Sequence, residues 1–124
     1  MNIIKMKNGY LNLIIGPMFS GKTTYLIDIY NKNLDKKILT INYAFDKRYS
    51  ENMLSSHDKK EIPCIFCESL YQVNEDEIER SDIILINEGQ FFLDIYEKVQ
   101  HWVDNLKKNI HIAALDGDFK RKPF

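Results

Sequence analysis

Short apolar runs alternate along the chain with polar and amphipathic stretches. Runs of this kind that are rich in β-branched side chains are typical of strands buried inside a sheet. The strands predicted in this way cover residues 11–15, 37–43, 62–66, 83–86 and 110–115. Pro63 restricts the third of these strands to a sheet edge or to a strand start, because proline has no N–H to donate to a neighbouring strand.

Apolar residues at helical spacing predict helices between the strands. The first helix follows residue 23 and turns one side toward the core, with Tyr25, Leu26, Ile29, Tyr30 and Leu34. The longest predicted helix carries a second stripe, with Ile95, Val99, Trp102, Val103 and Leu106. Asn74, followed by Glu77, resembles the cap of a short acidic helix, and the polar residues 44–60 are expected to form a loop. This order indicates an α/β fold in which crossover helices join parallel strands.

Composition and charge narrow the class of protein. The 124 residues suit one compact domain, residues 1–124, and the formal net charge of −1 gives no general attraction to nucleic acid or to an anionic membrane. No apolar run approaches the roughly twenty residues of a membrane-spanning helix, and the first residues lack the apolar stretch that is expected of a signal peptide. Two cysteines are too few for a disulfide framework, so a reducing, cytoplasmic compartment is expected.

The most informative segment is a glycine-rich loop between the first strand and the first helix. Residues 16–23 match the pattern G-x-x-x-x-G-K-[ST] with Gly16, Pro17, Met18, Phe19, Ser20, Gly21, Lys22 and Thr23. A strand before such a loop and a helix after it direct backbone N–H groups at phosphate oxygens. Lys22 adds charge for the terminal phosphates, and the Thr23 hydroxyl is placed to bind magnesium. The loop therefore predicts binding of a nucleoside triphosphate; the alternative is a chance match in a turn.

A second chemical motif follows the fourth strand. Residues 83–86 are apolar and lead into Asn87 and Glu88, as in a Walker B strand, which delivers carboxylates beside bound phosphates. Glu88 is the candidate general base toward an attacking hydroxyl group or water. Asn87 stands where a magnesium-supporting carboxylate is usual; its amide can accept a hydrogen bond from a metal-bound water but carries no negative charge. The alternative is a core strand that ends in a solvated turn.

Cys64 and Cys67 have the C-x-x-C spacing of metal-binding cysteines. A tetrahedral zinc site needs four ligands, and His57 would supply at most a third. Reduced thiols on a strand are therefore the preferred interpretation.

Four motifs, in order, resemble those of the type II thymidine kinases, the cellular, poxviral and bacterial group. They are residues 16–23, 46–49 (Asp-Lys-Arg-Tyr), 87–92 (Asn-Glu-Gly-Gln-Phe-Phe) and 113–124 (Ala-Ala-Leu-Asp-Gly-Asp-Phe-Lys-Arg-Lys-Pro-Phe). The resemblance implies a P-loop NTPase-like (RecA-like) parallel sheet. It also implies an enzyme that transfers the γ-phosphoryl group of ATP to the 5′-hydroxyl of thymidine for deoxynucleoside salvage.

The resemblance implies roles for individual positions. The phosphate loop would hold ATP with the help of Arg48, and Met18 would also border the thymine base. Glu88 would take the proton from the thymidine 5′-hydroxyl, and Gln90 would make a polar contact near this acceptor. The apolar residues implied to enclose the base are Leu115, Phe119 and Phe124.

Further roles concern charge near the phosphates. Magnesium bound with ATP would be held by Thr23, Asp46 and Asn87. Asp46 and Arg48 match the family's Asp-x-Arg pair, so both would also contact substrate, and Arg121 is a weaker phosphate candidate. Without the resemblance, the Asp46–Arg48 pair would be interpreted as a surface turn with a weak ion pair.

The chain departs from the family pattern at two places. Asn87 replaces the usual Asp, and the chain stops at Phe124, whereas family members continue into a lasso over thymidine and a four-cysteine zinc site. Zinc is therefore expected only in that missing C-terminal region, and none in this chain. The family is often tetrameric, so a homo-oligomer is a possible partner state.

Three hypotheses follow from these observations. The chain is a thymidine kinase or a C-terminally truncated fragment of one, or it is a nucleotide-binding remnant impaired in phosphoryl transfer. The third hypothesis is a different P-loop NTPase in which Glu88 activates water; residues 46–49 and 113–124 disfavour it.

Overall fold

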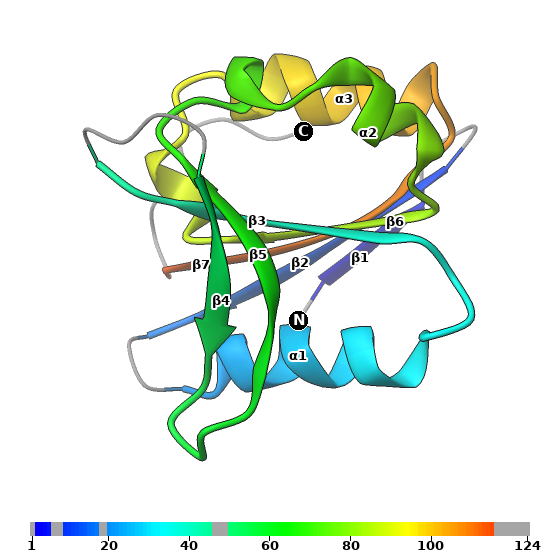
Figure 1. Cartoon of the computed structure of the whole chain (residues 1–124). Helices are drawn as coiled ribbons and strands as arrows, with labels where there is room; N and C mark the ends of the chain where they lie inside the picture. Colours follow the sequence, from blue (N-terminus) through cyan, green and yellow to red (C-terminus); the bar gives the residue numbers. More distant parts are fainter. Residues whose placement is uncertain (1, 6–8, 18–19, 46–49, 116–124) are drawn as a thin grey trace.

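The described residues form one mixed sheet of seven strands (Figure 1). The computed structural model describes residues 2–5, 9–17, 20–45 and 50–115, with the backbone alone for residues 2–5. In spatial order the strands are β1 (Asn2–Lys5), β2 (Tyr10–Gly16), β7 (Asn109–Leu115), β6 (Ile83–Asn87), β3 (Ile38–Tyr43), β5 (Glu61–Cys67) and β4 (Ser50–Ser55). The strands β2, β7, β6, β3 and β5 are parallel, and an antiparallel strand lies at each edge. The predicted α/β fold is confirmed.

Helices cover both faces of this sheet (Figure 1). One face packs against α1 (Lys22–Lys32), and the other packs against η1 (Leu70–Gln72), α2 (Glu75–Arg80) and α3 (Ile95–Asp104). A short turn of helix, η2 (Gly89–Phe91), follows β6 directly. The Asn74 side chain accepts a hydrogen bond from the backbone N–H of Asp76, which confirms the predicted cap of α2. Within the described part of the chain, no helix is long and apolar enough to cross a membrane.

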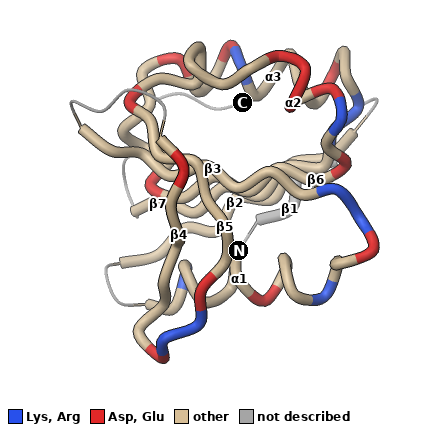
Figure 2. The backbone as a smooth tube through the Cα atoms, viewed as in Figure 1, with Lys and Arg blue, Asp and Glu red and all other residues tan. Residues whose placement is uncertain are grey.

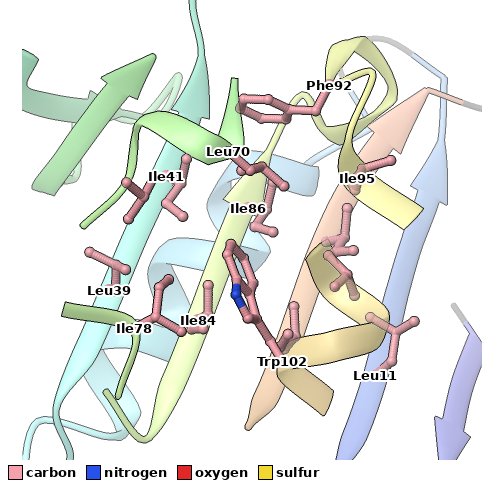
Figure 3. Close-up of a cluster of buried hydrophobic side chains, with 14 of the residues drawn as sticks. Leu11, Leu39, Ile41, Leu70, Ile78, Ile84, Ile86, Phe92, Ile95 and Trp102 are labelled. Carbon is pink, nitrogen blue, oxygen red and sulfur yellow. The ribbon is translucent and has the colours of Figure 1, made fainter. Parts of the chain in front are cut away.

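The core lies in two layers because the central strands bury side chains on both faces. Trp102 of α3 projects over β6 beside Ile84 and Ile86 in the larger layer (Figure 3). In the smaller layer, Leu26 and Ile27 of α1 pack against strand residues that include Leu85 and Ala113. All five residues of β6 are buried, which explains why this strand has a continuous apolar run rather than an alternating one.

Several local predictions from the sequence are wrong. Residues 44–60 contain the edge strand β4, which was hidden because Leu54 is its only buried residue. The strand that carries Pro63 is internal, but its pairing with β3 begins at Ile65, so Pro63 needs no N–H on that side. Leu34 lies beyond α1 and is 68% exposed. The longest described helix is α1 with 11 residues, whereas α3 has 10 and ends before Leu106.

The carboxyl ends of the parallel strands lie along one edge of the sheet. Gly16 at the end of β2 pairs with Leu115 at the end of β7, and Asn87 at the end of β6 pairs with Asn42 on β3. Four segments that are far apart in sequence therefore meet at the carboxyl edge of one sheet, where open α/β folds bind their ligands.

Candidate active site

A cavity of about 290 Å³ lies at this carboxyl edge. Its lining residues are Ser20 and Gly21 of the phosphate loop, Lys22, Thr23 and Thr24 at the start of α1, Ser55 at the end of β4 with Ser56 and His57 after it, Asn87 at the end of β6 with Glu88 after it, and Leu115 of β7. Seven of these residues are predicted site residues, and the fold brings them together. A larger cavity of about 610 Å³ lies near the amino ends of the strands and contains none of the predicted site residues. The carboxyl-edge cavity is therefore the candidate site.

The described residues at the two ends of the glycine-rich loop are suited to an anion. Gly21 has φ 87° and ψ 14°, a left-handed conformation that favours glycine, and it immediately precedes α1. A Cβ atom on Gly16 would lie 2.7 Å from the hydroxyl oxygen of Ser20, so a side chain there would push the loop open. The first turn of α1 carries no acidic residue. Its N–H groups and the positive end of its dipole are thus suited to an anion in the cavity.

The ammonium group of Lys22 lies across the loop. Its Nζ donates to the carbonyl oxygens of Gly16, at 2.8 Å, and Pro17, at 2.5 Å, and it lies 3.4 Å from the Ser20 hydroxyl. These acceptors are uncharged, so they hold the Lys22 ammonium group at the cavity without neutralising its positive charge. Phosphate oxygens carry full negative charge, so they would compete well for the same ammonium group.

Glu88 occupies a strained position at the end of β6. Its φ of 58° and ψ of 39° lie in the left-handed region, which is uncommon for a residue other than glycine. Gln90 donates from Nε2 to the Glu88 carboxylate oxygen Oε2 over 3.0 Å and accepts from the backbone N–H of Leu115 over 3.3 Å. The Gln90 amide thus ties Glu88 to the end of β7. Strain of this kind, of order 1–3 kcal/mol, is typical of functional sites.

The amide of Asn87 is part of a buried hydrogen-bond chain. Asn87 Nδ2 donates to Asn42 Oδ1 over 2.7 Å, and Asn42 Nδ2 donates to the Tyr43 carbonyl oxygen over 2.6 Å. Asn42 was missed from the sequence, although a polar residue near the end of a predicted strand was a signal that could have found it. The chain of amides fixes the orientation of Asn87 beside the cavity.

Phe91 and His57 were given no role at this cavity from the sequence. Phe91 on η2 is 48% exposed, and its ring lies 5.2 Å from the ring of Tyr43, measured between centroids. This ring lines a separate cavity of about 370 Å³ together with Tyr43, Glu68, Ser69, Leu93 and Asp94. His57 lies in the turn between β4 and β5 and lines the cavity. Its position depends on the β4–β5 hairpin, which was not recognised in the sequence.

The other predicted site residues lie outside the described part of the chain. They are Met18, Phe19, Asp46, Arg48, Phe119, Arg121 and Phe124. Among the described residues, no three His, Cys, Asp or Glu side chains gather into a cluster that could hold a metal ion. The oxygen donors at the cavity include the Thr23 hydroxyl, the Asn87 amide and the Glu88 carboxylate, and oxygen donors are the ligands that magnesium prefers.

Cys64 and Cys67 lie on opposite faces of β5. Cys64 packs into the layer under α1, and Cys67 packs into the layer under α3. Burial raises the pKa of the Cys64 thiol to about 12 and the pKa of the Cys67 thiol to about 11. The two sulfur atoms point apart and are held in their neutral forms, which favours the interpretation as packed thiols rather than metal ligands.

The comparisons with known proteins agree on one family. The family model for thymidine kinase matches residues 9–124. The chain is 42% identical over 120 residues to the thymidine kinase of Yaba monkey tumor virus, which covers 95% of this chain and 65% of the viral protein. Thymidine kinase 1 of Dictyostelium discoideum is 43% identical over 128 residues, covering 98% of this chain and 56% of that protein. The chain thus spans somewhat more than half the length of these curated relatives.

Proposed function

Because the chain belongs to the thymidine kinase family, we propose that it binds ATP with magnesium and transfers the γ-phosphoryl group to the 5′-hydroxyl of thymidine. The observation that carries the proposal is one cavity in which Lys22 and Thr23 at the start of α1 meet Glu88 at the end of β6. Phosphoryl transfer depends mainly on positioning and on neutralising charge, and this cavity offers groups for both tasks.

The phosphate side of the cavity is assigned to the donor nucleotide. Lys22 and the N–H groups at the start of α1 bind the terminal phosphates, and Arg48 adds charge by its place in the sequence motif. Magnesium, when bound with ATP, neutralises part of the phosphate charge. We assign it to the Thr23 hydroxyl and the Asn87 amide oxygen, with Asp46 as a third contributor from the sequence motif.

The other side of the cavity is assigned to the acceptor. Glu88 accepts the proton of the 5′-hydroxyl as the hydroxyl oxygen attacks the γ-phosphorus, and ADP leaves. Oε2 of Glu88 accepts from Gln90, so Oε1 is the atom that we assign to this proton. Leu115 lines the cavity and is suited to pack on the base, and the sequence motifs add Met18, Phe119 and Phe124.

A nucleotide-binding remnant without transfer activity is the second candidate function. The observation that favours it is the buried pair of neutral amides, Asn42 and Asn87, at the position where the motif usually supplies a carboxylate. Such a protein would bind ATP through the phosphate loop but stabilise the charge that develops during transfer less well.

Product analysis distinguishes the two candidates. The 124-residue chain is incubated with magnesium, ATP and thymidine, beside a thymidine-free control and a Glu88→Gln variant. We expect thymidine monophosphate from the wild-type chain only, because Gln cannot accept the proton. Binding of ATP without any monophosphate would support the remnant, and release of phosphate without thymidine would indicate an NTPase that uses water.

A further inference from the structure

A second cavity lies at the amino ends of the strands, away from the candidate active site. Its volume of about 610 Å³ is within the range of small-molecule sites. The end of α1, the α2–β6 and α3–β7 connections and the first residues of β2, β6 and β7 form its walls. These three strands are neighbours in the sheet and begin on the side opposite the phosphate loop (Figure 1). None of the roles assigned above uses this cavity.

Three lysines give the cavity a positive charge. Lys36 comes from the connection that follows α1, and Lys107 and Lys108 come from the α3–β7 connection. Asp82 is the acidic residue among the described lining residues, and its Oδ2 accepts from the Lys37 N–H over 3.1 Å. Figure 2 shows the basic segment between α1 and β3 on this side of the molecule. The excess of positive charge makes the cavity suited to an anion.

The α3–β7 connection holds its two lysines in defined positions. Lys108 Nζ donates to the carbonyl oxygens of Glu79, at 2.7 Å, and Ser81, at 2.6 Å. Both acceptors are uncharged, so the positive charge of the ammonium group is not neutralised by them. The Lys108 N–H donates to the Trp102 carbonyl oxygen over 3.0 Å. Lys107 has φ 60°, a left-handed conformation that is uncommon for lysine, and such backbone strain is typical of ligand-binding positions.

A chain of hydrogen bonds directs a hydroxyl donor at the cavity. Asn12 Nδ2 lies 3.0 Å from His111 Nδ1, and His111 Nε2 lies 3.4 Å from the Tyr10 hydroxyl oxygen. Burial lowers the pKa of His111 from 6.5 to about 4, so the ring carries one N–H at neutral pH. Because an amide nitrogen only donates, Nδ1 accepts from Asn12 and Nε2 donates to Tyr10. The Tyr10 O–H proton is then left for another acceptor, and Tyr10 and His111 both line the cavity.

The carbonyl groups at the end of α1 would repel an anion if they were open. Asn33 covers two of them, because its Nδ2 donates to the Ile29 oxygen over 2.8 Å and its backbone N–H donates to the Tyr30 oxygen over 3.2 Å. The Asn33 carbonyl oxygen itself accepts from the Lys36 N–H over 2.9 Å. The Lys36 ammonium group lies 3.9 Å from Asp35 Oδ2 at an exposed position, a weak pair with which a bound anion can compete.

We propose that this cavity is a second anion site, in which the ammonium groups of Lys107 and Lys108 and the Tyr10 O–H hold a phosphate or carboxylate group of a small molecule. Charged oxygen atoms of either group accept strongly from such donors. The volume of the cavity leaves room for the rest of the ligand. Because the phosphate loop lies at the other ends of the same strands, this site is separate from the one proposed for ATP and thymidine, and the inference does not depend on the proposed function.

An NMR titration tests the proposal with a readout for each site. The isotope-labelled 124-residue chain is titrated with inorganic phosphate and with citrate, and sodium chloride keeps the ionic strength constant. We expect the backbone amides of residues 107–109 to shift in a saturable way with at least one of the two anions. The phosphate loop is expected to bind phosphate too, so the amides of residues 21–24 should report a separate Kd, which Lys22→Ala should raise without affecting residues 107–109. The anion with the lower Kd at residues 107–109 identifies the preferred group.

Substitutions remove the proposed contacts one at a time. Tyr10→Phe keeps the ring but loses the O–H, and one lost hydrogen bond to a charged group should raise the Kd at residues 107–109 about tenfold. Lys107→Gly removes an ammonium group and suits the left-handed backbone, so it should raise this Kd severalfold without unfolding the connection. Lys98→Ala is the matched control, because it removes a lysine that pairs with Glu75 at 3.3 Å elsewhere on the surface, and it should leave the Kd unchanged.

The outcomes separate this inference from the proposed function. Saturable shifts that both Tyr10→Phe and Lys107→Gly weaken would support the second site. An unchanged Kd in either variant, with the variant folded, would overturn it, as would shifts that chloride alone reproduces. Shifts at residues 21–24 without any at residues 107–109 would also overturn it and leave the proposed function intact.

Discussion

The side-chain amides of Asn42 and Asn87 form a buried hydrogen bond of 2.7 Å between paired positions of β3 and β6. Two amides could make this contact in either direction, and the bond from the Asn42 nitrogen to the Tyr43 carbonyl oxygen selects the one in which the Asn87 nitrogen faces the Asn42 oxygen. A neutral, fully oriented pair thus stands where the family motif usually places a charge. The Asn42 amide thus fixes the orientation of the Asn87 side chain.

Asn87→Asp should destabilise the chain even though it restores the residue that is usual in the motif. A carboxylate at position 87 would face the Asn42 oxygen, and turning the Asn42 amide around would break its bond to Tyr43. We expect the free energy of unfolding to fall by about 1–3 kcal/mol, measured by urea denaturation at pH 7. Asn52→Asp on the exposed face of β4 is the control for the added charge. Equal stability of the Asn87→Asp and wild-type chains would show that the amide pair adapts freely.

The thiols of Cys64 and Cys67 should be unreactive in the folded chain. Burial raises the pKa of Cys64 to about 12 and that of Cys67 to about 11, so at pH 8 almost no thiolate is present. We expect a disulfide reagent to modify neither cysteine within minutes under native conditions and both in denaturant. Rapid native modification, or uptake of one zinc ion per chain, would contradict the placement of the two sulfur atoms on opposite faces of β5.

How well the sequence predicted the fold depends on where each strand lies. Residues 83–86 could be recognised because β6 is buried on both faces, so its apolar run is long and distinct. The edge strand β4 has little to bury and is mostly polar; no local pattern separates such a strand from a loop. Its partner β5 was predicted as a strand. Pro63 suggested that β5 lies at the edge of the sheet, but β4 occupies that edge.

The residues of the candidate site also divide into those that the sequence could predict and those that it could not. Lys22, Thr23 and Glu88 could be found because each belongs to a short motif whose chemistry is local. Asn42 reaches the site only through strand pairing, 45 residues before Asn87 in the sequence. His57 likewise depends on the hairpin and could not be assigned before the sheet order was known, whereas the position of Asn42 near the end of a predicted strand was a signal in the sequence.

His111 should make the stability of the chain depend on pH below neutrality. Its imidazole is buried, with Asn12 Nδ2 at 3.0 Å and the Tyr10 hydroxyl at 3.4 Å, and burial lowers its pKa from 6.5 to about 4. Between these values the unfolded chain binds a proton that the folded chain does not bind. The stabilisation is therefore complete above pH 6.5 and is lost as the pH falls toward 4.

The expected size of this effect is about 2 kcal/mol between pH 7 and pH 5. Urea denaturation at the two pH values measures it, with His111→Gln as the variant that should lose this part of the pH dependence. His101→Gln, at an exposed position, should keep it. The imidazole proton resonances give a direct check, because a His111 signal that titrates near pH 6.5 in the folded chain would contradict the assignment.

Substitution of Asp94 should lower the stability of the fold more than most substitutions outside the cavity. Its carboxylate is buried immediately before α3, where Oδ2 accepts from the Ser69 hydroxyl at 2.9 Å and the Tyr71 N–H at 3.0 Å. Oδ1 accepts from the Leu70 N–H at 3.2 Å. One side chain thus holds η1 against the start of α3 and keeps Leu70 in the core.

Asp94→Ala removes the acceptor that these three donors share, and only the Tyr71 N–H keeps another acceptor, the Ser69 hydroxyl oxygen at 3.2 Å. We therefore expect the free energy of unfolding to fall by about 2–4 kcal/mol. Asp94→Asn keeps one acceptor oxygen but turns an amide N–H₂ toward donors, and it should be intermediate. Asp35→Ala, at an exposed carboxylate 3.9 Å from Lys36, is the matched control and should change stability by less than about 0.5 kcal/mol. Hydrogen exchange supplies the local measurement: the amides of Leu70 and Tyr71 should exchange faster in Asp94→Ala than those of α1. Uniform acceleration across the sheet would show instead that Asp94 supports the whole fold rather than the junction of η1 with α3.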